Sequence, residues 1–283
     1  MVMIYSTIQQ DEIKYLQIAK NYYALSDDWL KKSEAEQHIE LCQLVSSRRK
    51  DLMFTGHSAC VLRGIPRLGK SEIRPHCISE KTKGSDFICW RHGLRDSNAT
   101  RINGLLVASP ARTICDLAKY DSISSLLVSI NHCLCKSLFT KEQLSYELEM
   151  SPGKKWQSSI KRLLKVATGK CESPLETLAW IKIYRAGFIL PEQQVNIYGN
   201  HSLIGRVDMY WKLLNRKIIL ELDGKVKYTD GKDIFAEKKR EDNLREKGYE
   251  VIRATWKDVA GDQFIKKLER ANIPKRRYHM EKL

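Results

Sequence analysis

Apolar residues in the first part of the chain recur mostly at helical spacing. Over residues 11–50 they include Ile13, Leu16, Ile18, Ala19, Leu30, Ile39, Leu41, Leu44 and Val45. This spacing predicts helical structure across 11–50. Ser33 followed by Glu36 predicts a capping box within it, and the basic run 48–50 suits the carboxyl end of a helix.

Strand-like segments follow a short predicted helix over 57–63. They cover residues 72–79, 86–91 and 101–107 and are interrupted by Pro75, Gly84 and Gly104. Helices are predicted again from Pro110, a favourable first-turn residue, to about residue 150.

The pattern changes after residue 150. A Ser-Pro-Gly break at 151–153 precedes a basic amphipathic helix over 156–167. The segments predicted next are a helix at 174–187, strands at 193–198, 202–210 and 216–223, a helix at 232–247, a strand at 249–254 and a helix at 258–271. This order predicts an α/β fold whose central mixed sheet is flanked by helices.

The chain therefore divides into four predicted regions. Residues 1–150 form a helical or α+β domain, and 151–171 form a basic helix and linker. Residues 172–273 form the α/β domain, and 274–283 form a basic tail.

Acidic residues stand at the ends of two of the predicted strands. Gly205-Arg206-Val207-Asp208 ends one, and Glu221-Leu222-Asp223-Gly224-Lys225 ends the next. Side chains alternate along a strand, so Glu221 and Asp223 point the same way, and Lys225 joins them if the chain stays extended. Converging carboxylates repel each other unless a hard divalent cation lies between them. A Mg²⁺ site beside a lysine is typical of phosphodiester hydrolysis.

The net charge of the chain and its distribution indicate the class of binding partner. The 283 residues are 42% hydrophobic and 29% charged, which indicates a globular protein. The net charge of +15 is uneven: residues 1–150 carry 20 basic and 17 acidic residues, and residues 151–283 carry 29 and 17. The half with the carboxylates thus holds +12 and indicates a polyanion, most commonly nucleic acid. The plainer alternative is a basic protein with solvated lysines.

Cysteines and apolar runs give expectations about location. The eight cysteines show no paired Cys-x-x-Cys, so reduced thiols in a cytoplasmic protein are expected. Cys133 and Cys135 beside His132 fit a buried helix better than a metal site. No apolar run approaches the roughly 20 residues of a membrane span, so we expect no membrane partner.

One segment of the chain matches the phosphate-loop motif in residue spacing but not in its predicted structural context. Residues 64–71, Gly-Ile-Pro-Arg-Leu-Gly-Lys-Ser, have Walker A spacing. A phosphate loop joins a strand to a helix, whereas this segment follows a predicted helix and precedes a predicted strand. Gly64 is therefore expected to end a helix, and no nucleotide cofactor is predicted.

The C-terminal region resembles the very-short-patch-repair-like endonucleases of the PD-(D/E)xK superfamily. The matching motifs are Ser173-Pro174-Leu175-Glu176, Gln194, Arg206-Val207-Asp208, Glu221-Leu222-Asp223-Gly224, Phe235, Arg240, Asp242, Leu244, Gly248, Val251, Arg253 and Asp258. The resemblance covers about ninety residues. It implies a restriction-endonuclease-like fold and a Mg²⁺-dependent endonuclease acting on DNA, in genome defence, on mobile elements or in repair.

The N-terminal region resembles AbiEi-type antitoxin-like proteins. The matching residues are Gly56-His57-Ser58-Ala59, Leu62, Gly64-Ile65-Pro66, Gly104, Ser109-Pro110-Ala111-Arg112-Thr113 and Asp116-Leu117-Ala118. Proteins of this group usually begin with a winged helix-turn-helix, for which the residues before Trp29 are too few.

The resemblance implies roles for individual residues. Asp208, Glu221 and Asp223 are predicted to hold Mg²⁺, for which Mn²⁺ can substitute, and Lys225 to orient or stabilise the nucleophile. Glu176 is predicted to be catalytic, to close a capping box with Ser173, or to do both, since a cap fixes the position of the side chain. The predicted phosphate-binding or supporting residues are Gln194, Arg206, Lys227 and Arg240.

Two departures from the family pattern bear on activity. A histidine usually follows the Asp-Gly, where this chain has Lys225, Lys227 and Tyr228. The superfamily signature places lysine at the position of Asp223, and reading Asp223-Gly224-Lys225 as D-x-K restores the lysine two residues later.

An impaired, antitoxin-type regulator that binds nucleic acid is therefore one alternative, and a structural protein that contacts RNA or an acidic partner is another. With one active centre per chain, cutting both strands needs a homodimer or two encounters, and a larger defence or mobile-element complex stays open.

Overall fold

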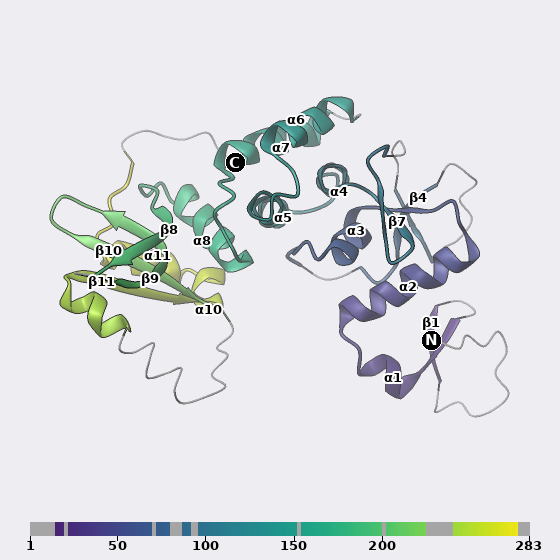
Figure 1. The fold of residues 1–283 in the computed structure, drawn as a ribbon, viewed down its shortest axis with the longest axis horizontal. Coiled ribbons are helices and arrows are strands. Elements are labelled where there is room, and N and C mark those ends of the chain that lie inside the picture. Colours follow the sequence, from purple (N-terminus) through teal and green to yellow (C-terminus); the bar gives the residue numbers. More distant parts are fainter. Residues whose placement is uncertain are drawn as a thin grey trace. The chain divides into compact units, whose positions relative to one another are not determined.

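Contacts divide the chain into two compact units, and each is described by itself. The structure, a computed structural model, describes residues 15–19, 22–69, 72–79, 87–91, 96–151, 154–199, 202–224 and 240–276. Unit 1 comprises the described residues up to Ser129 together with Ser137–Leu164. Unit 2 comprises Ile130–Lys136 and the described residues from Lys165 onward. Figure 1 shows the helices and strands of both units and labels many of them.

Unit 1 is built on a mixed five-stranded sheet. The strand order is β5 (Cys89–Trp90), β4 (His76–Ile78), β3 (Met53–Phe54), β7 (Leu105–Val107) and β6 (Thr100–Ile102). Its helices are α1 (Ser26–Leu30), α2 (Glu34–Arg48), α3 (Gly56–Arg63), α4 (Pro110–Leu117), the first part of α5 (Ile123–Cys135), α6 (Lys141–Met150) and most of α7 (Lys154–Val166). This composition confirms the mixed helix-and-strand character predicted for the N-terminal region.

The prediction of helix across 11–50 is wrong for its first described part. Residues 15–19 and 22–25 form an antiparallel pair of strands, β1 (Tyr15–Ala19) and β2 (Tyr22–Leu25). Clustered aromatic residues favour strand, and the pairing outweighs the helical spacing of the aliphatic residues. From residue 33 the prediction is confirmed. Ser33 Oγ accepts a hydrogen bond from the Glu36 amide, and the Glu36 carboxylate accepts one from the Ser33 amide.

The segment around the Walker A letters is also as expected. The predicted helix over 57–63 is α3, and Gly64 follows it with a left-handed φ of 67°. Gly64 therefore ends a helix, as glycine does where φ is positive. The strand-like segment predicted over 101–107, with its break at Gly104, is a tight hairpin of β6 and β7 that turns at Asn103-Gly104, where both residues have positive φ.

Unit 2 contains a mixed four-stranded sheet with helices. The order is β11 (Tyr249–Thr255), β10 (Lys217–Asp223), β9 (Leu203–Lys212) and β8 (Glu192–Tyr198). β10 runs parallel to β11, and the other neighbouring pairs are antiparallel. The helices are α8 (Pro174–Arg185), α10 (Trp256–Ala260) and α11 (Gln263–Arg270), and residues 240–246 are also helical. The predicted mixed sheet is confirmed.

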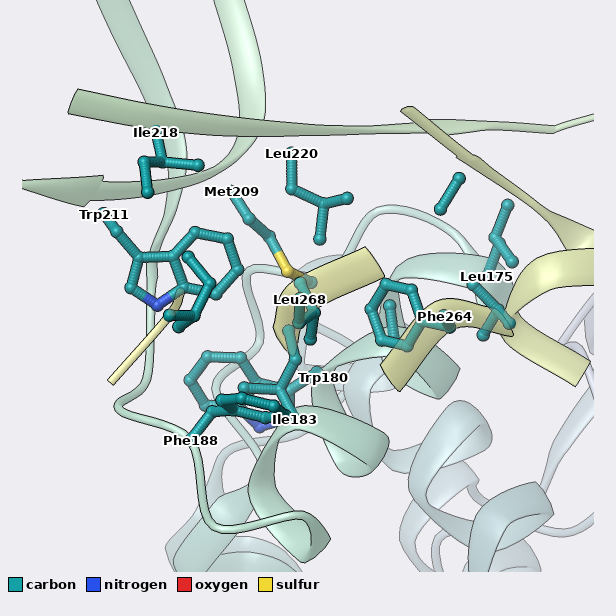
Figure 2. Packing of buried hydrophobic residues seen from close by; sticks show 14 of the residues in the cluster. Leu175, Trp180, Ile183, Phe188, Met209, Trp211, Ile218, Leu220, Phe264 and Leu268 are labelled. Atoms are coloured by element: carbon teal, nitrogen blue, oxygen red, sulfur yellow. The ribbon is translucent and has the colours of Figure 1, made fainter. Parts of the chain in front are cut away.

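Two hydrophobic clusters cover opposite faces of this sheet. Ile218 and Leu220 of β10 belong to a cluster with residues of α8 and α11. Figure 2 shows Trp180 and Ile183 of α8 and Phe264 and Leu268 of α11 packed beneath the strands. Ile219 belongs instead to a cluster with Leu244 of the 240–246 helix. Odd-numbered residues of β10 therefore face that helix, which places Glu221 and Asp223 on the same side as Leu244.

The final predicted helix, 258–271, is in fact two helices. Thr255 caps α10 through a complete capping box with Asp258, and the helix begins at Trp256. Gly261 separates α10 from α11. Glycine weakens a helix interior, so the break falls where the sequence allows it.

Two further observations concern location and thiols. In the described part of the chain, no helix is long and apolar enough to cross a membrane. All eight cysteines have free thiols, and Cys133 is fully buried in α5.

Truncation of Leu220 should destabilise unit 2 strongly. Leu220 is fully buried in the central strand β10, so Leu220→Ala leaves a cavity, and we expect the free energy of unfolding to fall by about 2–5 kcal/mol. Urea denaturation followed by circular dichroism measures the loss. Leu214→Ala is the control, since Leu214 is 98% exposed and should change stability by no more than about 0.5 kcal/mol. Equal effects of the two substitutions would contradict the packing described above.

Candidate functional site

The sheet of unit 2 splits where Asp208 lies. β9 pairs with β10 only as far as Met209 and Leu220, whereas β10 continues to pair with β11 up to Asp223. Beyond that point the Leu222 amide donates to Asp208 Oδ2 at 2.8 Å instead of to a ladder carbonyl. A side-chain carboxylate thus replaces a backbone acceptor. The ends of two predicted strands meet here.

Asp208 sits in an environment that disfavours its charge. Burial raises its pKa to about 6, and the negative charges of Glu176 and Asp223 act in the same direction. The hydrogen bond from the Leu222 amide and the positive charge of Arg240 only partly offset this. A carboxyl with a raised pKa beside other carboxylates is typical of a functional site, because a fold gains no stability from such crowding.

Glu176 approaches this point from α8. It is buried, and its Oε2 accepts hydrogen bonds from Gln194 Nε2 at 2.8 Å and from the Glu172 amide at 2.9 Å. Ser173 Oγ accepts from the Glu176 amide, as a helix cap does. Glu176 therefore closes only half of the predicted capping box, because its carboxylate is turned to Gln194 and not to the Ser173 amide.

Gln194 has an unusual backbone. Its φ is 55°, a left-handed value that a non-glycine residue rarely adopts and that costs about 1–3 kcal/mol. The flanking pairs, Gln193 with Met209 and Val195 with Val207, place it opposite Asp208. The strained residue thus directs its amide to Glu176 at the same level of the sheet where β9 leaves β10.

Glu221 is held by an arginine. Its residue surface is 8% exposed, and its Oε1 accepts from Arg240 Nη2 at 2.9 Å. Arg240 Nη1 also reaches the carbonyl oxygen of Arg206 at 3.5 Å. A buried carboxylate needs such a counter-charge, since desolvation of an unpaired charge costs several kcal/mol, on the order of the whole stability of a domain.

Asp223 belongs to a more exposed set of charges. Arg253 Nη1 lies 3.3 Å from Asp223 Oδ1, and Arg253 also donates to Glu241 Oε2 at 2.9 Å. Glu241 in turn accepts from Arg245, and these arginine hydrogen bonds lower the pKa of Glu241. The arginine therefore links the end of β10 to the 240–246 helix.

The remaining predicted site residues lie as follows. Arg206 pairs with Glu172, whose backbone amide binds Glu176, and the Arg206–Glu172 distance is 2.6 Å. Lys225 and Lys227 lie outside the described residues. The structure thus brings Glu176, Gln194 and Asp208 together. Arg240 connects Glu221 to this group, because it binds Glu221 and its charge acts on Asp208. Asp223 follows Glu221 on the same strand, β10.

Sequence reasoning assigned no site role to Arg253, Glu172 or Gly205. Arg253 could have been found from the parallel register, which pairs it with Glu221 on one sheet face. The other two carry no such signal: Glu172 contributes its backbone amide to Glu176 and its carboxylate to Arg206, and Gly205 acts by having no side chain.

The carboxylates of this site fit a hard divalent cation by chemistry. Asp208 and Asp223 each accept a hydrogen bond at one oxygen, and their second oxygens accept none from the described residues. Oxygen donors of this kind suit Mg²⁺. Asp208, Glu221 and Asp223 do not, however, form a set whose ligand atoms all lie within 4.8 Å among the described residues, and Arg240 and Arg253 are paired with two of them.

A set that does meet this spacing lies in unit 1, where it was not predicted. Glu72, His76 and Cys89 have one ligand atom each within 4.8 Å of the others. His76 Nδ1 faces three donors, namely the His57 amide, Arg91 and the Tyr120 hydroxyl. Arg91 Nη2 also lies 3.2 Å from His76 Nε2, so a guanidinium lies against both ring nitrogens. The arginine beside the ring further disfavours a cation.

His76 belongs to a polar cluster of unit 1 with buried His38 and His57, half-buried Arg67, and Tyr120, whose surface is 38% exposed. Arg67 Nη1 lies 2.6 Å from His57 Nδ1, and the Tyr120 hydroxyl lies 3.1 Å from His76 Nδ1. Burial lowers the pKa of His38 to about 4, of His57 to about 3 and of His76 to about 2. The three imidazoles are therefore neutral at neutral pH. His38 lies one turn before Leu41 and Cys42 on the buried face of α2, a position that could have revealed its burial.

The chain is similar to two proteins of Mycobacterium tuberculosis. They are described as uncharacterized protein MT2308, from strain CDC 1551 / Oshkosh, and uncharacterized protein Rv2248, from strain ATCC 25618 / H37Rv. Each is 23% identical over 159 residues, which cover 56% of this chain and 58% of the relative. The chain thus spans less than two thirds of the length of these relatives. No protein-family model and no solved structure matches it.

Replacing Asp208 by asparagine should stabilise the protein in metal-free buffer. The folded state raises the pKa of this carboxyl from 3.8 to about 6, so ionised Asp208 opposes folding above that pH, whereas the protonated carboxyl below pH about 4 does not. We expect Asp208→Asn to gain about 1–3 kcal/mol near pH 7 and to lose the gain as the pH falls to about 4. Urea denaturation in EDTA at several pH values measures the difference. A variant less stable than the wild type near neutral pH would contradict the account.

Acid should destabilise unit 1 through its histidines. Their folded-state pKa values lie below the ordinary 6.5, so the unfolded chain binds protons that the folded chain does not. Stability is therefore lost progressively as the pH falls below about 6.5. In NMR spectra of the folded protein, the imidazole signals of His38, His57 and His76 should not titrate between about pH 7.5 and 5.5. Titration of these signals near the ordinary value would show that the cluster is solvated.

Proposed function

We propose that unit 2 is a Mg²⁺-dependent endonuclease that hydrolyses phosphodiester bonds in DNA. The proposal is supported by one observation above all: β9 and β10 part at Asp208, whose pKa is raised by burial and by the carboxylates of Glu176 and Asp223. Acidic side chains concentrated at a split sheet edge, in a half of the chain with a net charge of +12, fit a site that binds a cation and a polyanion together.

Asp208, Glu221 and Asp223 are the proposed ligands of the cation. A bound Mg²⁺ supplies charge neutralisation at the scissile phosphate and lowers the pKa of a coordinated water. The Leu222 amide orients Asp208 by holding its Oδ2, and Gln194 orients Glu176. Glu176 adds negative charge that strengthens cation binding. Lys225 remains predicted to orient or stabilise the nucleophile.

We propose that unit 1 is an antitoxin-like domain, on the ground of its resemblance to AbiEi-type antitoxin-like proteins. His57 of that pattern belongs to the histidine cluster at the start of α3, and the neighbouring Ser58 Oγ lies 2.8 Å from His38 Nε2. A Cβ atom at Gly56 would lie 2.1 Å from the Tyr120 hydroxyl, so glycine is required there. This arrangement supports a structural role for the motif residues.

A second function is favoured by the arginine pairs of unit 2. Arg240 and Arg253 neutralise Glu221 and Asp223 without any metal. In a protein that only binds nucleic acid, such pairs would make the acidic residues structural. This alternative is the catalytically impaired regulator of antitoxin type.

DNA cleavage separates the two functions. We expect purified wild-type protein to cut labelled DNA in Mg²⁺ or Mn²⁺ and to be inactive in EDTA. Asp208→Ala and Glu221→Ala should each lower the cleavage rate by about 100-fold or more, since each removes a charged ligand. Duplex, nicked and single-stranded DNA and RNA are tested side by side.

Glu250→Ala is the matched control. Glu250 is an exposed carboxylate at the start of β11, paired with Arg216, and its removal should leave the rate unchanged. Equal cleavage by all four proteins would identify a contaminating nuclease. Salt-dependent binding without cleavage would favour the regulator instead.

A further inference from the structure

Arg240 reaches Glu221 by lying across a glycine. A Cβ atom on Gly205 would stand 2.9 Å from Arg240 Nη1 and 3.2 Å from its Cδ. The absence of a side chain at this position of β9 gives the guanidinium its place beside the strand. From there Arg240 contacts both Glu221 Oε1 and the backbone carbonyl oxygen of Arg206.

This arginine holds a carboxylate that the proposed cation also needs. Glu221 is buried and must have a positive partner, whether guanidinium or metal. The two partners repel each other, so both cannot share Glu221 at full occupancy. Arg240 also acts electrostatically on Asp208, so a cation that binds both carboxylates would lie close to the guanidinium.

We propose that Arg240 exchanges partners: it holds Glu221 in the metal-free protein, yields it to a divalent cation, and then binds a phosphate of the nucleic acid. The inference rests on the proposed nuclease function. The released guanidinium has an anionic partner at hand, because the substrate brings phosphates to the same cation. Guanidinium groups bind phosphate oxygens in pairs, which suits this second role. Arg240 is thus a positioning residue that keeps the acidic site folded until metal and substrate arrive.

Two substitutions remove the guanidinium in different ways. Arg240→Gln deletes its charge. Gly205→Ala keeps the charge but displaces the end of the flexible side chain, and the φ of Gly205 is not in the left-handed region, so the strand can accept alanine. Gly199→Ala is the control: a Cβ atom there meets its neighbours at 3.4–3.5 Å, which is ordinary contact, and none of them belongs to the site.

Two affinities of the full-length protein test the exchange. Mn²⁺ binding is measured by electron paramagnetic resonance, and DNA binding by fluorescence anisotropy with Ca²⁺ in place of Mg²⁺. We expect Mn²⁺ to bind about tenfold more tightly to Arg240→Gln and Gly205→Ala than to the wild type, because its competitor for Glu221 is gone. DNA should bind about tenfold more weakly to Arg240→Gln, because a phosphate contact is lost. Gly199→Ala should match the wild type in both.

The opposite signs of the two changes distinguish exchange from a structural role, which would weaken both. Mn²⁺ affinity that is unchanged or reduced in both variants overturns the inference. If Arg240→Gln fails to fold, Gly205→Ala alone decides. If the wild type binds Mn²⁺ and cleaves DNA, and the variants bind Mn²⁺ with the affinity of the wild type, the exchange is rejected and the nuclease proposal is retained. A wild type that neither binds Mn²⁺ nor cleaves DNA rejects both.

Discussion

The arrangement of unit 2 depends on where negative charge is tolerated in a hydrophobic sheet. β9 and β10 stay paired through their apolar residues and part at Asp208, the first residue whose side chain takes over a backbone hydrogen bond. Glu221 and Asp223 then extend from the face of β10 that also packs against the 240–246 helix. Three acidic residues are thus carried into a partly buried region by strands whose stability comes from the clusters on either side.

Such a region is stable only if positive groups accompany the carboxylates. Arg240 and Arg253 supply them from the two elements that flank the end of β10, the 240–246 helix and β11. Asp208 has no comparable ion pair among the described residues, and its pKa is raised accordingly. The site therefore combines two carboxylates that are paired with arginines and two, Asp208 and Glu176, that form no ion pair within the described part of the chain. The proposed nuclease and the proposed regulator differ in whether a bound cation neutralises the remaining negative charge of the site.

Strand alternation made part of this site predictable from the sequence. The apolar run before Glu221 fixes a buried strand, and its period of two places Glu221 and Asp223 on one face. The orientation of Glu176 was harder to predict from the sequence, because Ser173 and Pro174 form a helix cap whichever way the Glu176 carboxylate turns. Its choice of Gln194 depends on a left-handed backbone at residue 194 that no propensity predicts.

Tertiary contacts decided what the sequence pattern missed. Residues 15–19 and 22–25 pair as strands although the aliphatic residues of this region have helical spacing. The burial of His38, His57 and His76 depends on residues brought from α2, α3 and β4, which no local window contains. The role of Gly205 is visible only once Arg240 lies against it.

The central claim is that the parted strands of unit 2 form a cation site in which Asp208 and Glu221 share one metal. The most direct measurement is a crystal structure of the protein soaked in Mn²⁺, with anomalous diffraction to locate the ion. The account predicts an anomalous peak bound by Asp208 and Glu221, with the Arg240 guanidinium moved away from Glu221. An intact Arg240–Glu221 pair with no peak beside Asp208 would contradict it.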